Sequence, residues 1–144
     1  MNAMEISRTG LDVEWRRLEV IAQNIANMNT ALTGHGGGYI PLRLISGPVE
    51  HFDKAVSRHA NGNMPDPKGV RVYAVEVKES SIRRVYEPGH PHADQQGFVT
   101  YPNISHAEEM ALMVRTSRAY EANLVAIAAA QQIYSSALQL GRQS

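Results

Sequence analysis

The last third of the chain carries the clearest pattern of hydrophobic and polar positions. Nine positions follow one another at alternating steps of three and four residues, and seven of them are apolar: Met110, Met113, Ser117, Tyr120, Leu124, Ile127, Gln131, Tyr134 and Leu138. This spacing, kept over about four heptads, is typical of a helix that packs along one seam against another helix. The pattern predicts a long helix over residues 104–141, followed by a short tail, 142–144.

Short signals predict where this helix begins and ends. Ser105 and Glu108 have the S-x-x-E spacing of a capping box, directly after the proline at position 102. Gly141 stands where a residue in the left-handed conformation commonly follows the last helical turn. We therefore expect Ser105 to cap the helix and Gly141 to end it.

The first thirty residues carry a weaker version of the same pattern. Met4, Leu11, Leu18 and Ile25 are separated by sevens, and Trp15 and Ala22 fill the intermediate positions. This pattern predicts a helix within residues 1–30 that pairs, parallel or antiparallel, with the carboxy-terminal one. Gly10 indicates a late start or a break in this helix, and the polar run 27–30 should end it.

Proline and glycine concentrate in the middle of the chain. All seven prolines and nine of the eleven glycines lie between Thr30 and Pro102. Because these residues oppose long helices, residues 31–103 are predicted to form strands and loops. The glycine-rich run 34–38 and residues 59–68 are interpreted as mobile loops.

Three short segments of this middle region have strand character. Val70–Val77 is rich in branched and aromatic residues, but its alternation changes phase near Ala74, as a bulged strand would. Ile82–Tyr86 and Phe98–Tyr101 are separated by the turn-prone residues 87–91. A small antiparallel sheet or hairpin is the predicted result.

The predicted fold is mainly α with a small β insertion. The N- and C-terminal helices pair as a coiled-coil-like hairpin, and the middle forms a β-hairpin and loop region. With 144 residues the chain has the length of one domain. Residues 1–30 and 104–141 are expected to form one axial helical domain, with 31–103 as its insertion.

Composition removes several classes of function. Lysine plus arginine total 14 and aspartate plus glutamate total 14, so the chain has no net field to hold nucleic acid. There is no cysteine, which excludes disulfides and thiol chemistry. The first residues lack the basic and apolar blocks of a cleaved secretory signal.

The segment Ala122–Gly141 contains no charged residue. Polar residues such as Asn123, Gln131 and Gln139 interrupt it, so we do not interpret it as a membrane span. A helix without a charged face is usually buried all round, and a chain this short offers little to cover it. Other subunits are the natural cover; an ordinary helical hairpin with an alanine-rich outer face is the alternative.

Candidate chemistry is sparse. His90, His92 and Asp94 could in principle bind a divalent metal, but two histidines around a proline in a turn have no fixed geometry, and we interpret them as solvated turn residues. Glu108 and Glu109 are acids in a first helical turn, where they favour the helix dipole. We expect no catalytic residues, no metal, no cofactor and no small-molecule substrate, and hence no enzyme.

Two blocks of sequence resemble a known family, the flagellar basal-body rod proteins. The first runs from Leu18 to Asn27, with Thr30 after it, and contains Asn24, Ile25, Ala26 and Asn27. The second comprises Tyr86, Glu87, Pro88, Gly89, His90 and Pro91, then Ala93, Asp94 and Gly97, then Tyr101-Pro102-Asn103, Glu108-Glu109-Met110, Ser117, Arg118, Ala119, Tyr120, Glu121, Ala122 and Asn123. Together they span about a third of the chain. The run GHGGGYIPLR and His92 depart from the family pattern.

The resemblance implies a structural subunit of the proximal rod of the bacterial flagellum, which polymerises helically and transmits torque. It implies export from the cytoplasm by the flagellar type III apparatus without a cleaved signal, and a place in the periplasmic rod. Its partners would be copies of itself, other rod proteins and the membrane-ring base. The alternatives are a soluble helical-hairpin adaptor or export chaperone, and a small metal-dependent hydrolase using His90, His92 and Asp94.

The residues expected to form the helix-packing and assembly interface lie on the two seams. They are Leu11, Trp15, Leu18, Ile25, Met110, Met113, Tyr120, Leu124, Ile127, Tyr134 and Leu138.

Overall fold

The structure of the chain is a computed structural model that describes residues 3–33, 37–50, 56–57, 68–79 and 82–142. Two long helices, α1 (Ala3–Asn27) and α3 (His106–Arg142), flank four strands in the sequence. The strands are β1 (Leu42–Pro48), β2 (Val70–Val77), β3 (Ile82–Tyr86) and β4 (Phe98–Pro102). The predicted fold, mainly α with a small β insertion, is confirmed.

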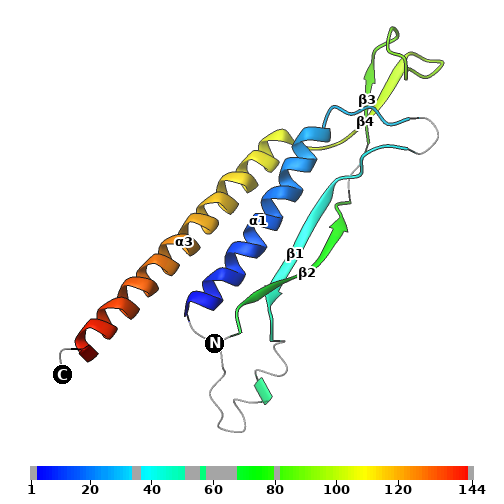
Figure 1. Ribbon diagram of the computed structural model, residues 1–144. Helices are drawn as coiled ribbons and strands as arrows, with labels where there is room; N and C mark the ends of the chain where they lie inside the picture. Colours follow the sequence, from blue (N-terminus) through cyan, green and yellow to red (C-terminus); the bar gives the residue numbers. More distant parts are fainter. Residues whose placement is uncertain (1–2, 34–36, 51–55, 58–67, 80–81, 143–144) are drawn as a thin grey trace.

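Helix α1 lies between α3 on one side and the β1–β2 ribbon on the other (Figure 1). The two helices are antiparallel, since Gly10 approaches Asn123 while Asn24 bonds Glu109. This arrangement settles the relative direction that the sequence left open. In the described part of the chain, no helix is both long enough and apolar enough to cross a membrane.

The core lies between α1 and the β1–β2 sheet. Val13 and Val20 of α1 pack with Leu44 of β1, and Leu42 and Val72 extend this cluster. The two valines are seven residues apart and therefore lie on one face of the helix. The sheet thus covers a stripe of α1 that is separate from its seam with α3.

Strand β2 contains the predicted bulge. Ile45 pairs with Ala74 and Ser46 pairs with Val72, so Tyr73 is the extra residue of the antiparallel ladder. The change of phase in the sequence near Ala74 is the trace of this bulge. The partner strand β1 was not predicted; its Gly47 and Pro48 oppose strand formation locally, and its pairing with β2 and packing on α1 override them.

The predicted hairpin is formed by β3 and β4, which pair antiparallel from Ile82 opposite Pro102 to Tyr86 opposite Phe98. It projects beyond the end of the helical pair at which α1 ends and α3 begins (Figure 1). Gly97 has a φ of 82°, and a side chain there would also meet Tyr86. Glycine is therefore required for the turn that leads into β4.

Two predictions about the helix ends were wrong. Helix α1 runs without interruption through Gly10, which faces the other helix at close range, so the glycine serves packing and marks no break. Helix α3 continues through Gly141 to Arg142, and Gly141 is not left-handed. The predicted cap is confirmed, because Ser105 Oγ accepts the N–H of Glu108 at 3.4 Å.

The polar run after Asn27 ends α1 as predicted. Within the two predicted loops, residues 34–36 and 59–67 lie outside the described residues.

Candidate assembly interface

Gly10 of α1 lies directly against Asn123 of α3. A Cβ atom built there would lie 2.6 Å from Asn123 Oδ1. Asn123 itself donates from Nδ2 to the carbonyl of Ala119, one turn earlier, at 2.9 Å. Glycine leaves room for the Asn123 side chain here. Further along the contact, the rings of Trp15 and Tyr120 lie 6.2 Å apart.

A buried polar cluster ties the far end of the helical pair to the sheet. Asn24 is 1% exposed and Glu109 is 2% exposed. The Asn24 amide donates to Glu109 Oε2 at 3.2 Å and to the carbonyl of Leu42 at 2.8 Å. Its oxygen accepts the Tyr39 hydroxyl at 2.6 Å and the N–H of Leu42 at 3.0 Å. One side chain thus joins α1, α3, β1 and the segment before β1.

The charge of Glu109 is compensated from the end of β2. Lys78 Nζ lies 3.3 Å from Glu109 Oε1 and 3.5 Å from Glu108 Oε2. Burial raises the pKa of Tyr39 above its usual value, and the nearby carboxylate of Glu109 acts in the same direction. Tyr39 therefore remains a neutral hydrogen-bond donor to Asn24 at neutral pH.

Two further side chains of α1 bind the strands of the sheet. Arg17 donates to Ser46 Oγ at 2.7 Å and to the carbonyl of Leu44 at 3.4 Å. Thr9 Oγ1 accepts the N–H of Val70 at 3.0 Å. These contacts fix the ribbon on the helix along most of its length.

The structure divides the predicted seam residues into two groups. Leu11, Leu18, Ile25, Met113, Tyr120 and Ile127 are half-buried along the contact between the helices, whereas Trp15, Met110, Leu124, Tyr134 and Leu138 are exposed. The buried residues of α3, Glu109 and Thr116, lie one position away from the predicted seam. The predicted seam therefore lies along one side of the contact between the helices, and several of its side chains are exposed to solvent.

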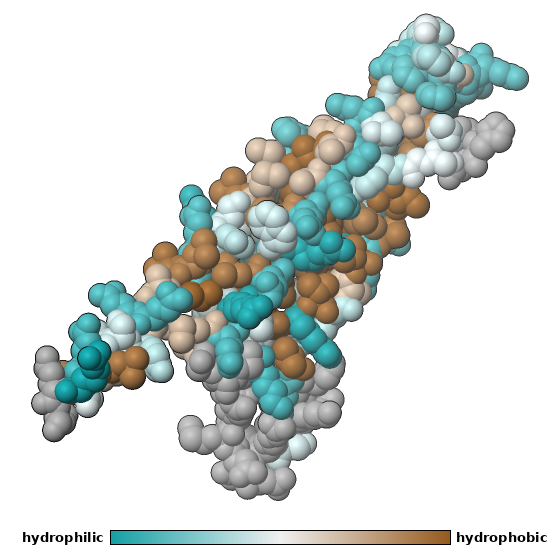
Figure 2. All heavy atoms as spheres, viewed as in Figure 1, coloured by the Kyte–Doolittle hydropathy of each residue, from teal (hydrophilic) through white to brown (hydrophobic). Residues whose placement is uncertain are grey.

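Helix α3 extends beyond the described start of α1. Every residue from Gln131 to Arg142 is exposed. This extension carries Ile133, Tyr134, Leu138 and Leu140, which are between 54% and 71% exposed. Apolar side chains recur on the surface along α3 and near its carboxy-terminal end (Figure 2).

A hollow of about 690 Å³ lies where α1 begins and α3 continues, lined by Met4, Ala130, Ile133, Tyr134 and Ala137, together with Ala3. Tyr134 and Leu138 follow the half-buried Ile127 at spacings that keep all three on one face. The face of α3 that packs against α1 thus continues beyond the described start of α1, where it is exposed.

The role of Asn24 was not predicted from the sequence, where the residue belongs only to the family signature. The sheet-facing stripe of Val13 and Val20 was not predicted either. These valines are seven residues apart, which is a signal in the sequence, but Leu11, Leu18 and Ile25 have the same spacing and were predicted to face the other helix.

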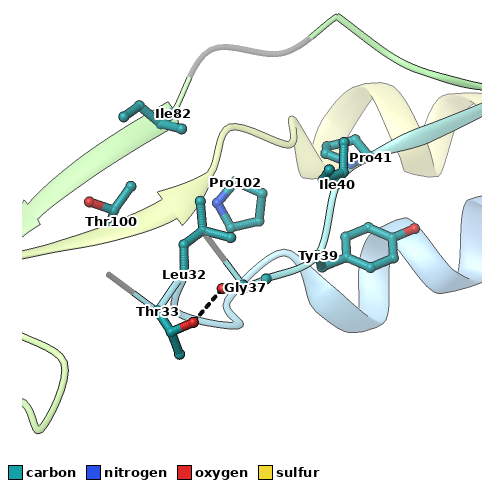
Figure 3. A pocket seen from close by; sticks show the side chains of 10 residues that line it. Leu32, Thr33, Gly37, Tyr39, Ile40, Pro41, Ile82, Thr100 and Pro102 are labelled. Atoms are coloured by element: carbon teal, nitrogen blue, oxygen red, sulfur yellow. Dashed lines mark hydrogen bonds between the residues drawn. The ribbon is translucent and has the colours of Figure 1, made fainter. Parts of the chain in front are cut away.

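A pocket of about 350 Å³ lies between the segment before β1 and the β3–β4 hairpin (Figure 3). Its described lining is apolar or neutral, with Leu32, Pro41, Ile82 and Pro102 among its residues. The Tyr39 hydroxyl points away from the pocket and binds Asn24 instead (Figure 3). The described lining offers no acid–base pair for catalysis.

The histidine turn has internal partners. His90 Nδ1 accepts the N–H of His92 at 3.1 Å. Asp94 accepts the N–H groups of Phe98 and Gln96, each at 2.9 Å, and also binds Arg84. These contacts, with that of Phe98 the largest, lower the pKa of Asp94. Among the described residues, no group of three or more histidines and acids is placed to hold a metal ion.

Two models of known protein families match this chain and identify the class of protein to which it belongs. The family model described as Flagella basal body rod protein matches residues 4–31. The model described as Flagellar basal body rod FlgEFG protein C-terminal matches residues 95–140. Both matches fall on the two long helices and their flanks, so the class is that of the flagellar basal-body rod proteins.

Full-length relatives narrow this class. The chain is 34% identical to the flagellar basal-body rod protein FlgC of Borreliella burgdorferi, over 96% of this chain and 95% of the relative. Identity to FlgC of Bacillus subtilis is 28% over 98% and 97%, and to FlgC of Salmonella typhimurium 30% over 99% and 98%. The chain belongs to the FlgC family of flagellar basal-body rod proteins and is a structural rod subunit.

Proposed function

We propose that this structural rod subunit forms part of the proximal rod, where it polymerises with copies of itself and other rod proteins. The rod would transmit torque from the membrane-ring base toward the distal rod and hook. The subunit would leave the cytoplasm through the flagellar type III export apparatus without a cleaved signal and assemble in the periplasm. The comparisons give the adaptor and chaperone alternative no support.

The uncovered extension of α3 is the observation that carries this proposal. Its apolar side chains lie on the same face of α3 that α1 covers earlier in the helix. A helix of the next subunit can therefore pack on this face beyond the described start of α1. Such a contact joins different surfaces on the two subunits. Contacts of this kind build filaments when the rotation from one subunit to the next does not close a ring.

The energy of this contact comes from apolar burial. Complete burial of a large apolar side chain contributes about 1.5–3 kcal/mol, and the exposed fractions of these side chains leave roughly half or more of that gain available per residue. An exposed ion pair contributes about 0–1 kcal/mol. We therefore assign torque resistance to the seam residues, among them Leu124, Tyr134 and Leu138, and not to surface charges.

Leu138→Asp tests the proposal. Leu138 is 54% exposed in the single chain, so the substitution should leave the fold of the monomer unchanged. In the assembled rod it would bury a carboxylate, and we expect loss of this subunit from purified basal bodies and loss of swimming. Leu138→Met keeps the apolar volume and is the matched control. Wild-type swimming by the Asp variant would show that this face is not an assembly contact.

A further inference from the structure

The two edges of the β1–β2 ribbon differ. The edge of β1 is closed by α1, because Asn24 binds both backbone groups of Leu42 and Arg17 reaches the carbonyl of Leu44. At the edge of β2, Thr9 binds the N–H of Val70. Among the described residues, none binds the N–H and C=O groups of Val72 and Val75 that face away from β1. An edge of this kind is a template for another strand.

The hydrogen-bonding phase of the ladder identifies the outward groups. Lys78 N–H donates to the carbonyl of Pro41 at one end, and Val49 N–H donates to the carbonyl of Gly69 at the other. Counting inward from both ends to the bulge, Val72 and Val75 occupy positions whose N–H and C=O groups face away from β1. Both residues can therefore exchange hydrogen bonds with an added strand.

The sequence of β2 is complementary to itself in the antiparallel direction. It reads V-R-V-Y-A-V-E-V, so two copies aligned about their centre place Arg71 opposite Glu76 and Val72 opposite Val75. In a regular strand, positions an odd number apart point to opposite faces. The bulge at Tyr73 shifts this alternation by one residue, so Val72 and Val75 lie on the same face of the sheet. Their partners show this, because Val72 pairs with Ser46 and Val75 with Leu44, two positions on the same face of β1.

Beside this edge runs a groove of about 550 Å³ between α1 and β2. Its lining includes Asp12, Val13 and Arg16 from α1, and Val72 and Val75 from β2. A strand added to β2 would lie along this groove. Its valines would then face Val13 and extend the apolar layer under the sheet.

We propose that two copies of this chain pair through β2, antiparallel and about a two-fold axis, to form a four-stranded sheet. Two-stranded ribbons are marginal by themselves, and additional strands with an apolar face stabilise them. Arg71 already stacks over Tyr73, and Glu76 already pairs with Arg43 at 3.2 Å. The second copy adds a charge partner to each of these groups at the rim of the interface.

A two-fold pair uses the same surface on both copies and closes on itself. It is therefore a form of the unassembled chain and not a contact that extends a filament. The pairing uses β2, whereas the rod contact uses α3. The two proposals can accordingly fail independently.

Charge reversal tests the pairing. Arg71→Glu, Glu76→Arg and the double exchange are compared by sedimentation equilibrium, all in an Arg43→Ala background that removes the intrachain pair. The two-fold axis repeats each contact, so each single reversal should weaken dimerisation at least about tenfold. The double exchange should restore it. A chain that stays monomeric, or a double exchange as weak as the single ones, overturns the pairing.

A cross-link gives a second measurement. The chain has no cysteine, and Ala74 lies next to the expected two-fold axis. Ala74→Cys should form a disulfide-linked dimer on mild oxidation, whereas Gln95→Cys, exposed in the β3–β4 loop, should not. Equal cross-linking of both variants overturns the pairing. Failure of both tests would remove the dimer, whereas the presence of this chain in purified basal bodies would leave the rod function standing.

Discussion

Asn24 should carry more stability than any surface position of α1. Asn24→Ala removes four hydrogen bonds, two of them to the backbone of Leu42, one to Glu109 and one from Tyr39. Their loss leaves the Leu42 N–H without its side-chain acceptor and the 2%-exposed Glu109 carboxylate without its amide donor. An unsatisfied buried group costs about 1–3 kcal/mol. We expect the free energy of unfolding to fall by about 3 kcal/mol.

The assay is urea unfolding of dilute protein followed by circular dichroism at a helix wavelength. Gln23→Ala, at the exposed neighbouring position of the same helix, is the matched control and should change stability by less than about 0.5 kcal/mol. If the two substitutions cost the same, the cluster around Asn24 does not hold the sheet and α3 on α1.

A second variant tests the electrostatic part of the reasoning. Asn24→Asp places a carboxylate beside Glu109, and like charges favour the protonated form, which raises the pKa of the introduced group in the folded state. The folded protein then binds more protons than the unfolded one. The variant should therefore gain stability relative to Asn24→Ala as the pH falls below neutral. A difference between the two variants that does not change with pH would contradict this account.

Two further predictions concern the helix contact and the hairpin. Gly10→Ala should destabilise the wild type by about 1–3 kcal/mol, because its Cβ meets Asn123, but in an Asn123→Ala background it should stabilise by up to about 1 kcal/mol through helix propensity; a double-mutant unfolding cycle measures both. Asp94 has a lowered pKa in the folded state, so its stabilisation of the hairpin is present above the unfolded pKa and is lost as the pH falls through the folded value. The amide resonance of Phe98 should follow this titration in the wild type and not in Asp94→Asn.

The β region shows how far local pattern reaches. The strand Val70–Val77 and its bulge were predicted because the change of phase near Ala74 is a property of consecutive residues. Strand β1 was not predicted, because Gly47 and Pro48 lower the local strand propensity of this segment. Its pairing partner also lies more than twenty positions away in the sequence. Contacts between distant segments override local propensity at such places.

The sequence by itself determined the two long helices, the hairpin, the serine cap and the family, because periodicity, turn residues and motifs are local. It also located an uncharged segment in need of cover. Only the tertiary structure decided that Gly10 serves close packing, that Asn24 joins four segments and that α3 extends past α1. A helical residue has neighbours on several sides, and the sequence states its spacing along the chain but not which neighbour each side meets.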